Sequence, residues 1–210
     1  MKYNYISIEG NIGAGKTSLA TMIAKDYDAQ LILEQFEDNS FLPKFYKKPD
    51  KYAFPLEMSF LAERFQQLKD KLSLGDLFHS FTIADYYIAK SIVFSKETLK
   101  KDEFILYSKL YNIIVASLPK PELLVYLHLD TKKLQQNIRK RGREYELNIK
   151  DEYLDKIQNS YFDYLRKQLQ MRILIIDTNR IDFVNKPTDY QKIISILNQE
   201  YSFGIHRIVP

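Results

Sequence analysis

The residues with the clearest chemistry form a glycine-rich stretch near the N-terminus, residues 10–17, which reads GNIGAGKT. It matches the pattern G-x-x-x-x-G-K-[ST] and follows an apolar run, residues 3–8, that is typical of a strand. In such a loop, backbone N–H groups converge on phosphate oxygens, Lys16 reaches the β- and γ-phosphates, and the Thr17 hydroxyl can bind Mg²⁺. A helix over 18–25 would add its positive N-terminal dipole. The alternative is a glycine-containing turn that binds nothing. We interpret the stretch as a phosphate-binding loop formed by Gly10, Asn11, Ile12, Gly13, Ala14, Gly15, Lys16 and Thr17.

Acidic residues follow four of the apolar runs. Glu34, Asp85, Asp130 and Asp177 each stand just after a run. Because parallel strands end at one edge of a sheet and ligands bind there, these carboxylates are candidates for a general base or for binding a metal ion. Asp residues also cap helix N-termini, and Asp130 fits that alternative.

A short basic cluster, residues 139–143, reads RKRGR. Guanidinium groups suit phosphate oxygens, and such a cluster can also bind nucleic acid. With 31 basic and 27 acidic residues, however, the chain lacks the basic stripe that duplex binding needs. We therefore interpret the cluster as part of a phosphate site and expect no nucleic-acid partner.

A framework must bring these candidate residues together. Apolar runs recur at 3–8, 30–33, 81–84, 123–129 and 172–176, with helix-like stretches between most of them. This alternation predicts an α/β fold with a parallel sheet of about five strands and helices on both faces. The ligand is expected at the carboxyl ends of the strands. A chain of 210 residues suits a single domain over residues 1–210.

Two longer stretches, 51–74 and 95–118, carry apolar residues at helical spacing. Each exceeds what a strand-to-strand crossover needs, so both are candidates for a wall of the substrate site, a subunit interface, or both. Pro43, Pro49 and Pro55 indicate a loop-rich region ahead of the first long helix.

The composition excludes some classes of site. Without cysteine, the chain can form neither a disulfide nor a zinc–thiolate site, and three scattered histidines do not suggest a metal cluster. No apolar run approaches the roughly 18 residues of a membrane-spanning helix, and no leader precedes the first strand. We expect a cytoplasmic protein with no membrane partner.

Four segments together resemble the deoxynucleoside kinases, the family that includes deoxycytidine, deoxyguanosine and deoxyadenosine kinases. They are 8–17 (IEGNIGAGKT), 34–39 (EQFEDN), 45–49 (FYKKP) and 141–146 (RGREYE). The specificity lies in their order and spacing, because a phosphate loop alone suits many nucleotide enzymes. The resemblance covers nearly the whole chain and implies a P-loop kinase fold with a mobile lid at about 139–149.

The resemblance implies roles for several side chains. Glu34 would be the general base that accepts the proton of the nucleoside 5′-hydroxyl. Tyr46 and Glu146 would hold the sugar 3′-hydroxyl. Arg141 and Arg143 match the lid arginines, which close over the transferred phosphoryl group. The alternatives are that Glu34 caps the next segment and that the arginines belong to a solvated helix end.

Further assignments rest on the same resemblance. Residues 177–183 are similar to the loop that wraps the donor adenine, so Asp182 and Phe183 are candidates for ATP binding. Phe94 would correspond to a residue that stacks on the acceptor base, and ordinary core packing is the alternative. The family also implies Mg²⁺ as cofactor, ATP as phosphate donor and a homodimer formed through the long helices.

The chain departs from the family pattern after the third strand. The family usually carries Asp-Arg-Ser or Glu-Arg-Ser there, and the arginine steadies the base carboxylate and the 5′ oxygen. Here residues 85–87 read DYY. Asp85 can still assist Thr17 in binding Mg²⁺, directly or through water. The role of the missing arginine stays open, and Lys90 is a candidate to replace it.

The second departure is Glu57, where the family has Gln, with Arg64 two helical turns onward. An ionised Glu57 can only accept hydrogen bonds, which suits the paired N–H groups of guanine, with Arg64 available to a carbonyl oxygen. Adenine would need a protonated Glu57, or its N1 satisfied by water or Arg64. Alternatively, Glu57 and Arg64 pair with each other or with solvent. The pattern favours a purine.

The sequence therefore predicts a kinase that transfers the γ-phosphate of ATP to the 5′-hydroxyl of a deoxynucleoside, with deoxyadenosine or deoxyguanosine favoured. One alternative is a thymidylate-type nucleoside-monophosphate kinase, but the acidic segment 34–38 argues against a site for the acceptor's own phosphate. Another is a P-loop NTPase that hydrolyses slowly and acts as a conformational switch. A nucleic-acid-stimulated ATPase fits the weak basic character poorly.

Overall fold

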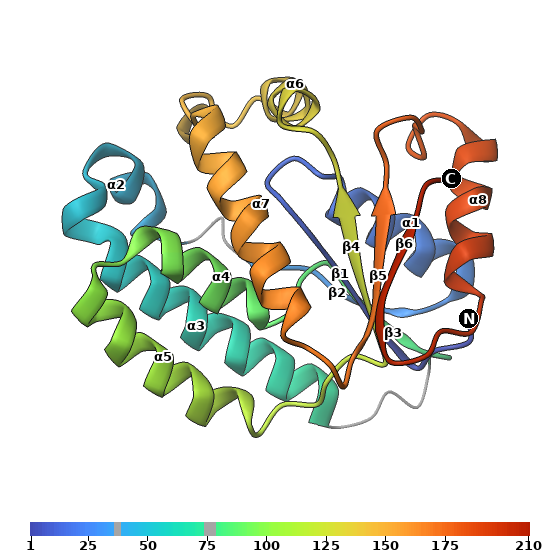
Figure 1. The fold of residues 1–210 in the computed structure, drawn as a ribbon, viewed down its shortest axis with the longest axis horizontal. Coiled ribbons are helices and arrows are strands. Elements are labelled where there is room, and N and C mark those ends of the chain that lie inside the picture. Colours follow the sequence, from blue (N-terminus) through green and yellow to red (C-terminus); the bar gives the residue numbers. More distant parts are fainter. Residues whose placement is uncertain (36–38, 74–78) are drawn as a thin grey trace.

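A parallel sheet crosses the middle of the molecule, as the computed structural model in Figure 1 shows. The structure describes residues 1–35, 39–73 and 79–210. Within them the sheet has six strands in the order β2-β3-β1-β4-β5-β6, and every neighbouring pair is parallel. The strands are β1 (Tyr5–Gly10), β2 (Gln30–Ile32), β3 (Thr82–Ala84), β4 (Leu123–His128), β5 (Arg172–Asp177) and β6 (Gly204–Ile208). The prediction of about five strands missed β6, because this edge strand, GIHRI, contains only two large apolar residues and is only partly buried.

Helices connect the strands and cover both faces of the sheet. They are α1 (Lys16–Tyr27), α2 (Leu42–Lys47), α3 (Pro49–Ser73), α4 (Ala89–Thr98), α5 (Lys101–Val115), α6 (Thr131–Arg141), α7 (Asp151–Arg166) and α8 (Pro187–Leu197), with a short 3₁₀ helix, η1 (Glu144–Glu146). None of the helices in the described part of the chain is long and apolar enough to cross a membrane.

The single long helix predicted over 95–118 was wrong. The chain forms two helices there, because Leu99 and Lys100 are extended and Glu103 accepts a hydrogen bond from the Lys100 N–H, which begins α5 anew. The loop predicted around Pro55 was also wrong, since this proline lies inside α3. The next residue, Leu56, is buried in one apolar cluster with Phe45 of α2. Residue 74, the predicted end of this helix, lies outside the described residues.

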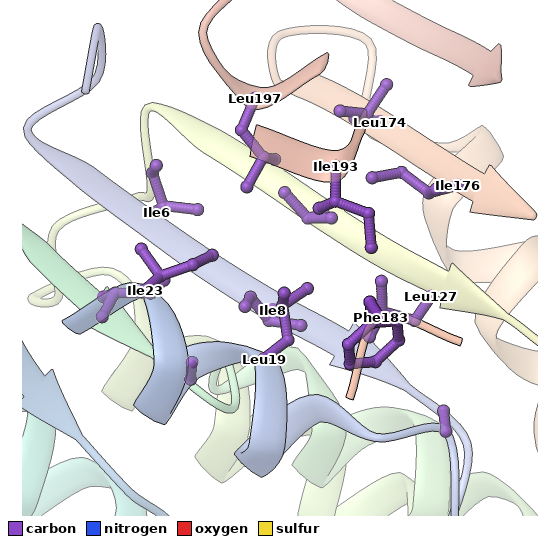
Figure 2. Close-up of a cluster of buried hydrophobic side chains, with 14 of the residues drawn as sticks. Ile6, Ile8, Leu19, Ile23, Leu127, Leu174, Ile176, Phe183, Ile193 and Leu197 are labelled. Atoms are coloured by element: carbon purple, nitrogen blue, oxygen red, sulfur yellow. The ribbon is translucent and has the colours of Figure 1, made fainter. Parts of the chain in front are cut away.

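The two faces of the sheet pack against different helices. Leu123, Val125 and Leu127 of β4 belong to the core beneath α1 and α8, whereas Leu124 and Tyr126 belong to the core beneath α3, α4, α5 and α7. Because successive side chains of a strand point to opposite faces, a strand buried on both reads as an unbroken apolar run. Figure 2 shows the first core, with side chains from β1, β4, β5, α1 and α8 interlocked.

The topology places the candidate residues at one edge of the sheet. β1 ends at Gly10 and α1 begins at Lys16, so the phosphate-binding loop lies at the carboxyl ends of the strands, between β3 and β4. The register pairs Ile32 of β2 with Ala84 of β3. The segments that carry Glu34 and Asp85 therefore leave adjacent strands side by side.

Candidate active site

The phosphate-binding loop has the bent backbone that its glycines permit. Gly13 and Gly15 adopt φ angles of 83° and 88°, in the left-handed region that other residues rarely occupy. A Cβ atom on Gly15 would lie 2.9 Å from the Phe183 ring. Phe183, predicted as an ATP contact, therefore lies directly over the loop that opens α1.

Lys16 points into the loop that precedes it. Its Nζ donates hydrogen bonds to the carbonyl oxygens of Gly10, at 3.0 Å, and Asn11, at 2.9 Å. Burial and the nearby charge of Lys90 lower the pKa of Lys16 to about 8. A phosphate anion beside this ammonium would oppose both effects.

Glu34 is held by two cations. Its Oε1 accepts hydrogen bonds from Arg64 Nε at 2.9 Å and lies 2.7 Å from Arg64 Nη2, and its Oε2 pairs with Lys90. The side chain is only 9% exposed, and burial alone would raise its pKa. The charges of Lys90 and Arg64 outweigh that effect and lower the pKa of Glu34 to about 2. The carboxylate is therefore ionised and fixed in direction.

Asp85 links this carboxylate segment to the loop. Its Oδ2 accepts a hydrogen bond from Thr17 Oγ1 at 2.5 Å, and its Oδ1 accepts one from the Glu34 N–H at 2.7 Å. The described residues contain no cluster of three or more His, Cys, Asp or Glu side chains that could hold a metal ion alone. A hydroxyl and a carboxylate beside a phosphate loop do fit Mg²⁺, which binds through few protein ligands plus phosphates and water.

Two clefts meet at these residues. The inner cleft lies between the sheet edge and α2, α3, α4 and α7, and among the residues that line it are Glu34, Tyr46, Glu57, Arg64, Asp85, Lys90, Phe94 and Glu146. The outer cleft lies between the loop, α6 and the segment after β5, and its lining includes Gly13, Ala14, Gly15, Lys133, Asn137, Asp182 and Phe183. Both clefts share Lys16, Thr17, Arg141 and Arg143. Two bound molecules could therefore meet end to end beneath these four side chains.

The predicted lid residues form a cluster over that junction. Arg141, the last residue of α6, pairs with Glu146, and Arg143 Nη1 lies 3.5 Å from Glu146 Oε1. Gly142 turns the chain between them with a φ of 72°. Glu146 is buried, whereas the arginines are partly exposed. The carboxylate thus orients both guanidinium groups toward the clefts.

The lining of the inner cleft includes a second buried carboxylate, Glu57 of α3. Glu57 is 3% exposed, and its Oε1 accepts a hydrogen bond from Thr98 Oγ1 at 2.8 Å. Burial raises the pKa of Glu57 to about 7, although the charge of Arg64 and the hydroxyl of Thr98 lower it. Phe94 lines the same cleft and also packs edge-on against Tyr161, so its base-stacking and core-packing interpretations are compatible.

Tyr46 packs face-on against Tyr145, with ring centroids 5.7 Å apart. Burial and the charge of Glu146 raise its pKa, so its hydroxyl stays protonated as a donor. The two residues predicted to hold the sugar, Tyr46 and Glu146, thus lie on the same wall of the inner cleft.

Several predicted residues lie elsewhere than expected. Gly10 and Asn11 line neither cleft, and the Asn11 amide donates instead to the Leu154 carbonyl of α7 at 2.7 Å. Ile12 lines the inner cleft rather than the outer one. Asp182, by contrast, lines the outer cleft together with Phe183, and hydrogen bonds from Asn185 lower its pKa.

The proposed pairing of Glu57 with Arg64 is not what the structure shows. Arg64 donates to Glu34 and, through Nη1 at 2.8 Å, to Ser91 Oγ. Arg64 also lines the inner cleft, and its predicted contact with a base carbonyl stays a prediction. Arg64 and Lys90 both pair with Glu34, so Lys90, the candidate to replace the missing arginine, lies beside this carboxylate. The expectation that Glu34 merely caps a segment finds no support in these contacts.

Two strand-end carboxylates do not line either cleft. Asp130 stands at the N-cap of α6 but makes no side-chain capping bond, and its Oδ1 instead accepts a hydrogen bond from Asn179 at 3.3 Å. Asp177 Oδ1 accepts one from the Asn179 N–H at 2.9 Å. Both carboxylates thus contact Asn179, in the segment that leads to Phe183.

The sequence did not single out Glu9, Ser91 or Thr98. Glu9 is buried beside the loop and accepts hydrogen bonds from the Tyr87 N–H and the Tyr161 hydroxyl, both at 2.8 Å. Its position just before the glycine-rich pattern was the available signal. Thr98 carried no signal in the sequence. This residue ends α4, and the single helix predicted over 95–118 placed no helix end there.

Comparison with known proteins fits this geometry. A family model described as "Deoxynucleoside kinase" matches residues 6–201. The chain belongs to the deoxynucleoside kinase family. It is 37% identical to the deoxyguanosine kinase of Bacillus subtilis over 194 residues, or 90% of this chain and 93% of that protein. It is 30% identical to the deoxyadenosine kinase of Dictyostelium discoideum over 200 residues, or 94% of this chain and 79% of that protein.

A solved structure has a similar fold. Deoxyadenosine kinase from M. mycoides with bound dATP matches with a TM-score of 0.79 at 26% identity, over 92% of this chain and 98% of that chain. Family membership confirms the predicted resemblance, the P-loop kinase fold and the phosphotransferase activity on deoxynucleosides, with ATP use following from the family. The thymidylate-type kinase, the NTPase switch and the nucleic-acid-stimulated ATPase are thereby set aside.

Proposed function

We propose that this deoxynucleoside kinase transfers the γ-phosphate of ATP to the 5′-hydroxyl of a purine deoxynucleoside, with deoxyguanosine preferred. The observation that carries the base assignment is Glu57, a buried carboxylate that lines the inner cleft. When ionised it only accepts hydrogen bonds, and guanine offers two adjacent N–H groups on its Watson–Crick edge. Similarity to a deoxyguanosine kinase and a deoxyadenosine kinase supports a purine.

Glu34 acts as the general base in this proposal. The 5′-hydroxyl donates a hydrogen bond to its carboxylate, which takes the proton as the O5′–Pγ bond forms and the bond from Pγ to the β–γ bridging oxygen breaks. Its low pKa keeps it ionised at every physiological pH. Arg64 and Lys90 fix its direction, and Lys90 lies where it can also contact the 5′ oxygen, as expected for the replacement of the missing arginine.

Groups from the phosphate-binding loop and from the lid stabilise the negative charge of the transferred phosphoryl group. Lys16 and the loop N–H groups bind the β- and γ-phosphates, and Arg141 and Arg143 stabilise the oxygens of the migrating group. Thr17 and Asp85 would hold Mg²⁺, which neutralises phosphate charge when bound. Because both clefts share four of these side chains, the donor and acceptor ends fall in line.

The remaining predicted residues select the two ligands. Tyr46 and Glu146 hold the sugar 3′-hydroxyl, and Phe94, which lines the same cleft, stacks on the acceptor base. In the outer cleft, Phe183 and the backbone at Asp182 bind the donor adenine above Gly15.

A homodimer through the long helices completes the proposal. Three apolar side chains on α5 are exposed, Ile105 at 46%, Leu106 at 51% and Ile113 at 73%. Exposed apolar groups on one helix are typical of a protein interface. Light scattering during gel filtration is expected to give twice the monomer mass of 24.9 kDa, and a monomer at all concentrations would refute this part.

The first experiment is a set of initial rates with Mg·ATP and each of deoxyguanosine, deoxyadenosine, deoxycytidine and thymidine. We expect 5′-monophosphates from the purines, fastest from deoxyguanosine, and a loss of about 10² to 10⁴-fold in Glu34→Gln. The matched control Glu63→Gln alters an exposed carboxylate on α3 and should keep the rate. A preference for pyrimidines would refute the base assignment, and an active Glu34→Gln would refute the general base.

A further inference from the structure

Thr98 and Glu57 form a polar pair where α4 ends beside α3. Thr98 Oγ1 lies 2.8 Å from Glu57 Oε1. The other carboxylate oxygen, Glu57 Oε2, is buried without a hydrogen-bond partner among the described residues. Since Glu57 lines the inner cleft, this oxygen is the group that an acceptor base would meet. A buried oxygen without a partner is costly, so a ligand that satisfies it gains affinity.

The Thr98 hydroxyl has two acceptors and one proton. Besides Glu57 Oε1, it lies 3.1 Å from the Phe94 carbonyl oxygen, four residues earlier in α4. It can therefore donate to an ionised Glu57, or turn to Phe94 when Glu57 carries its own proton. Neither protonation state of Glu57 leaves the hydroxyl without an acceptor.

The two protonation states of Glu57 recognise different purines. The ionised carboxylate accepts from both N1–H and the N2 amino group of guanine. The protonated carboxyl donates to N1 of adenine through its O–H and accepts from the N6 amino group through its other oxygen. The same side chain thus complements either Watson–Crick edge, and its proton decides which.

We propose that Thr98 sets the base preference of this kinase by stabilising the ionised form of Glu57, so that deoxyguanosine is increasingly favoured over deoxyadenosine as the pH rises. The inference rests on the proposed purine substrate and adds to it a residue and a pH dependence. Thr98 acts through Glu57 and is therefore a positioning residue that determines specificity.

The surroundings of Glu57 leave it as the group that titrates near neutral pH. Burial raises its pKa to about 7 against the lowering effects of Arg64, Thr98 and Lys90. The charged or titratable groups around it come from α3, α4, α5, α7, the region of α2 and the segment after β2, and they are Arg64, Lys90, Tyr107, Tyr153, Tyr46 and Glu34. The pKa of Glu34 is lowered to about 2, and burial raises the pKa values of the three tyrosines, so Glu34 and these tyrosines keep one protonation state between about pH 6 and 8.

The test is the ratio of kcat/KM for deoxyguanosine to that for deoxyadenosine, measured from about pH 6 to about pH 8. The ratio cancels the titration of Lys16, which serves both substrates. In the wild type the ratio should rise up to about tenfold per pH unit. Thr98→Val keeps the shape of the side chain but removes the hydroxyl. In this variant we expect the whole curve of the ratio against pH to move up by about one pH unit, so that the ratio at neutral pH falls about tenfold.

Two further variants separate the possible outcomes. Thr98→Ser keeps the hydroxyl and should retain the wild-type profile, whereas Glu57→Gln cannot ionise and should give a ratio independent of pH. A wild-type enzyme that phosphorylates both purines with a constant ratio overturns the inference alone. An unchanged profile in Thr98→Val does the same. If neither purine deoxynucleoside is phosphorylated at any pH, the proposed function itself fails.

Discussion

Replacing Glu34 by Gln should destabilise the protein by an amount that follows from its ion pairs. Gln has the shape and neutrality of the protonated carboxyl, so the substitution removes only the charge. The pKa of Glu34 is about 2 in the folded protein against an ordinary value of 4.5. Each unit corresponds to about 1.4 kcal/mol, so the ionised carboxylate contributes about 3 kcal/mol to folding at neutral pH.

The sign of the pH dependence is fixed by the direction of this shift. A lowered carboxyl pKa stabilises the fold above about pH 4.5, and the contribution is lost as the pH falls toward about 2. The difference in unfolding free energy between wild type and Glu34→Gln should therefore shrink from about 3 kcal/mol at pH 7 to about 2 kcal/mol near pH 3.5.

Urea unfolding followed by circular dichroism measures both values. Glu63→Gln is the control, because this exposed carboxylate lies next to Arg64 on α3. Its substitution should change the free energy of unfolding by no more than about 0.5 kcal/mol. The reasoning is refuted if Glu34→Gln is as stable as the wild type at pH 7. A difference that stays constant with pH would also refute it, because that result would assign the loss to packing rather than to charge.

Three other outcomes are expected from the loop and its neighbours. Gly15→Ala should raise the KM for ATP and destabilise the fold by about 1–3 kcal/mol. The φ of Gly15 is 88°, and the new Cβ would lie 2.9 Å from the Phe183 ring. An unchanged KM and an unchanged stability would contradict this prediction. The KM for ATP should rise as the pH passes about 8, because the pKa of Lys16 is lowered to about 8 and the neutral amine attracts phosphate poorly. A KM that does not depend on pH would argue against this titration of Lys16. Asp85→Asn should raise the Mg²⁺ concentration for half-maximal rate about tenfold or more, with Thr17 still in place, and an unchanged Mg²⁺ requirement would remove Asp85 from the metal site.

Local sequence patterns were enough to predict most of the fold and the phosphate-binding loop. The loop depends on a strand, two well-placed glycines and a helix start, all of which are close together in the sequence. The strands buried on both faces gave unbroken apolar runs, whereas β6 did not, because an edge strand needs few apolar residues. The break between α4 and α5 was missed because a capping box at Lys100 interrupts an otherwise continuous apolar periodicity.

The partners of the charged residues could not be read in the same way. Glu34 and Arg64 are 30 residues apart, and Glu34 and Lys90 are 56 apart, so their pairing depends on how α3 and α4 pack over the sheet edge. The same packing sends Arg64 to Glu34 and leaves Glu57 with Thr98, a residue without any signal of its own.

By itself the sequence determined the fold class, the phosphate chemistry and the family. These depend on short motifs and on the order in which the motifs follow one another along the chain. The tertiary structure decided which cation neutralises which carboxylate. An ion pair needs side chains from distant segments within about 4 Å in a buried setting, and a single sequence carries no record of that distance. The ionised state of Glu34 and the raised pKa of Glu57 are consequences of that packing.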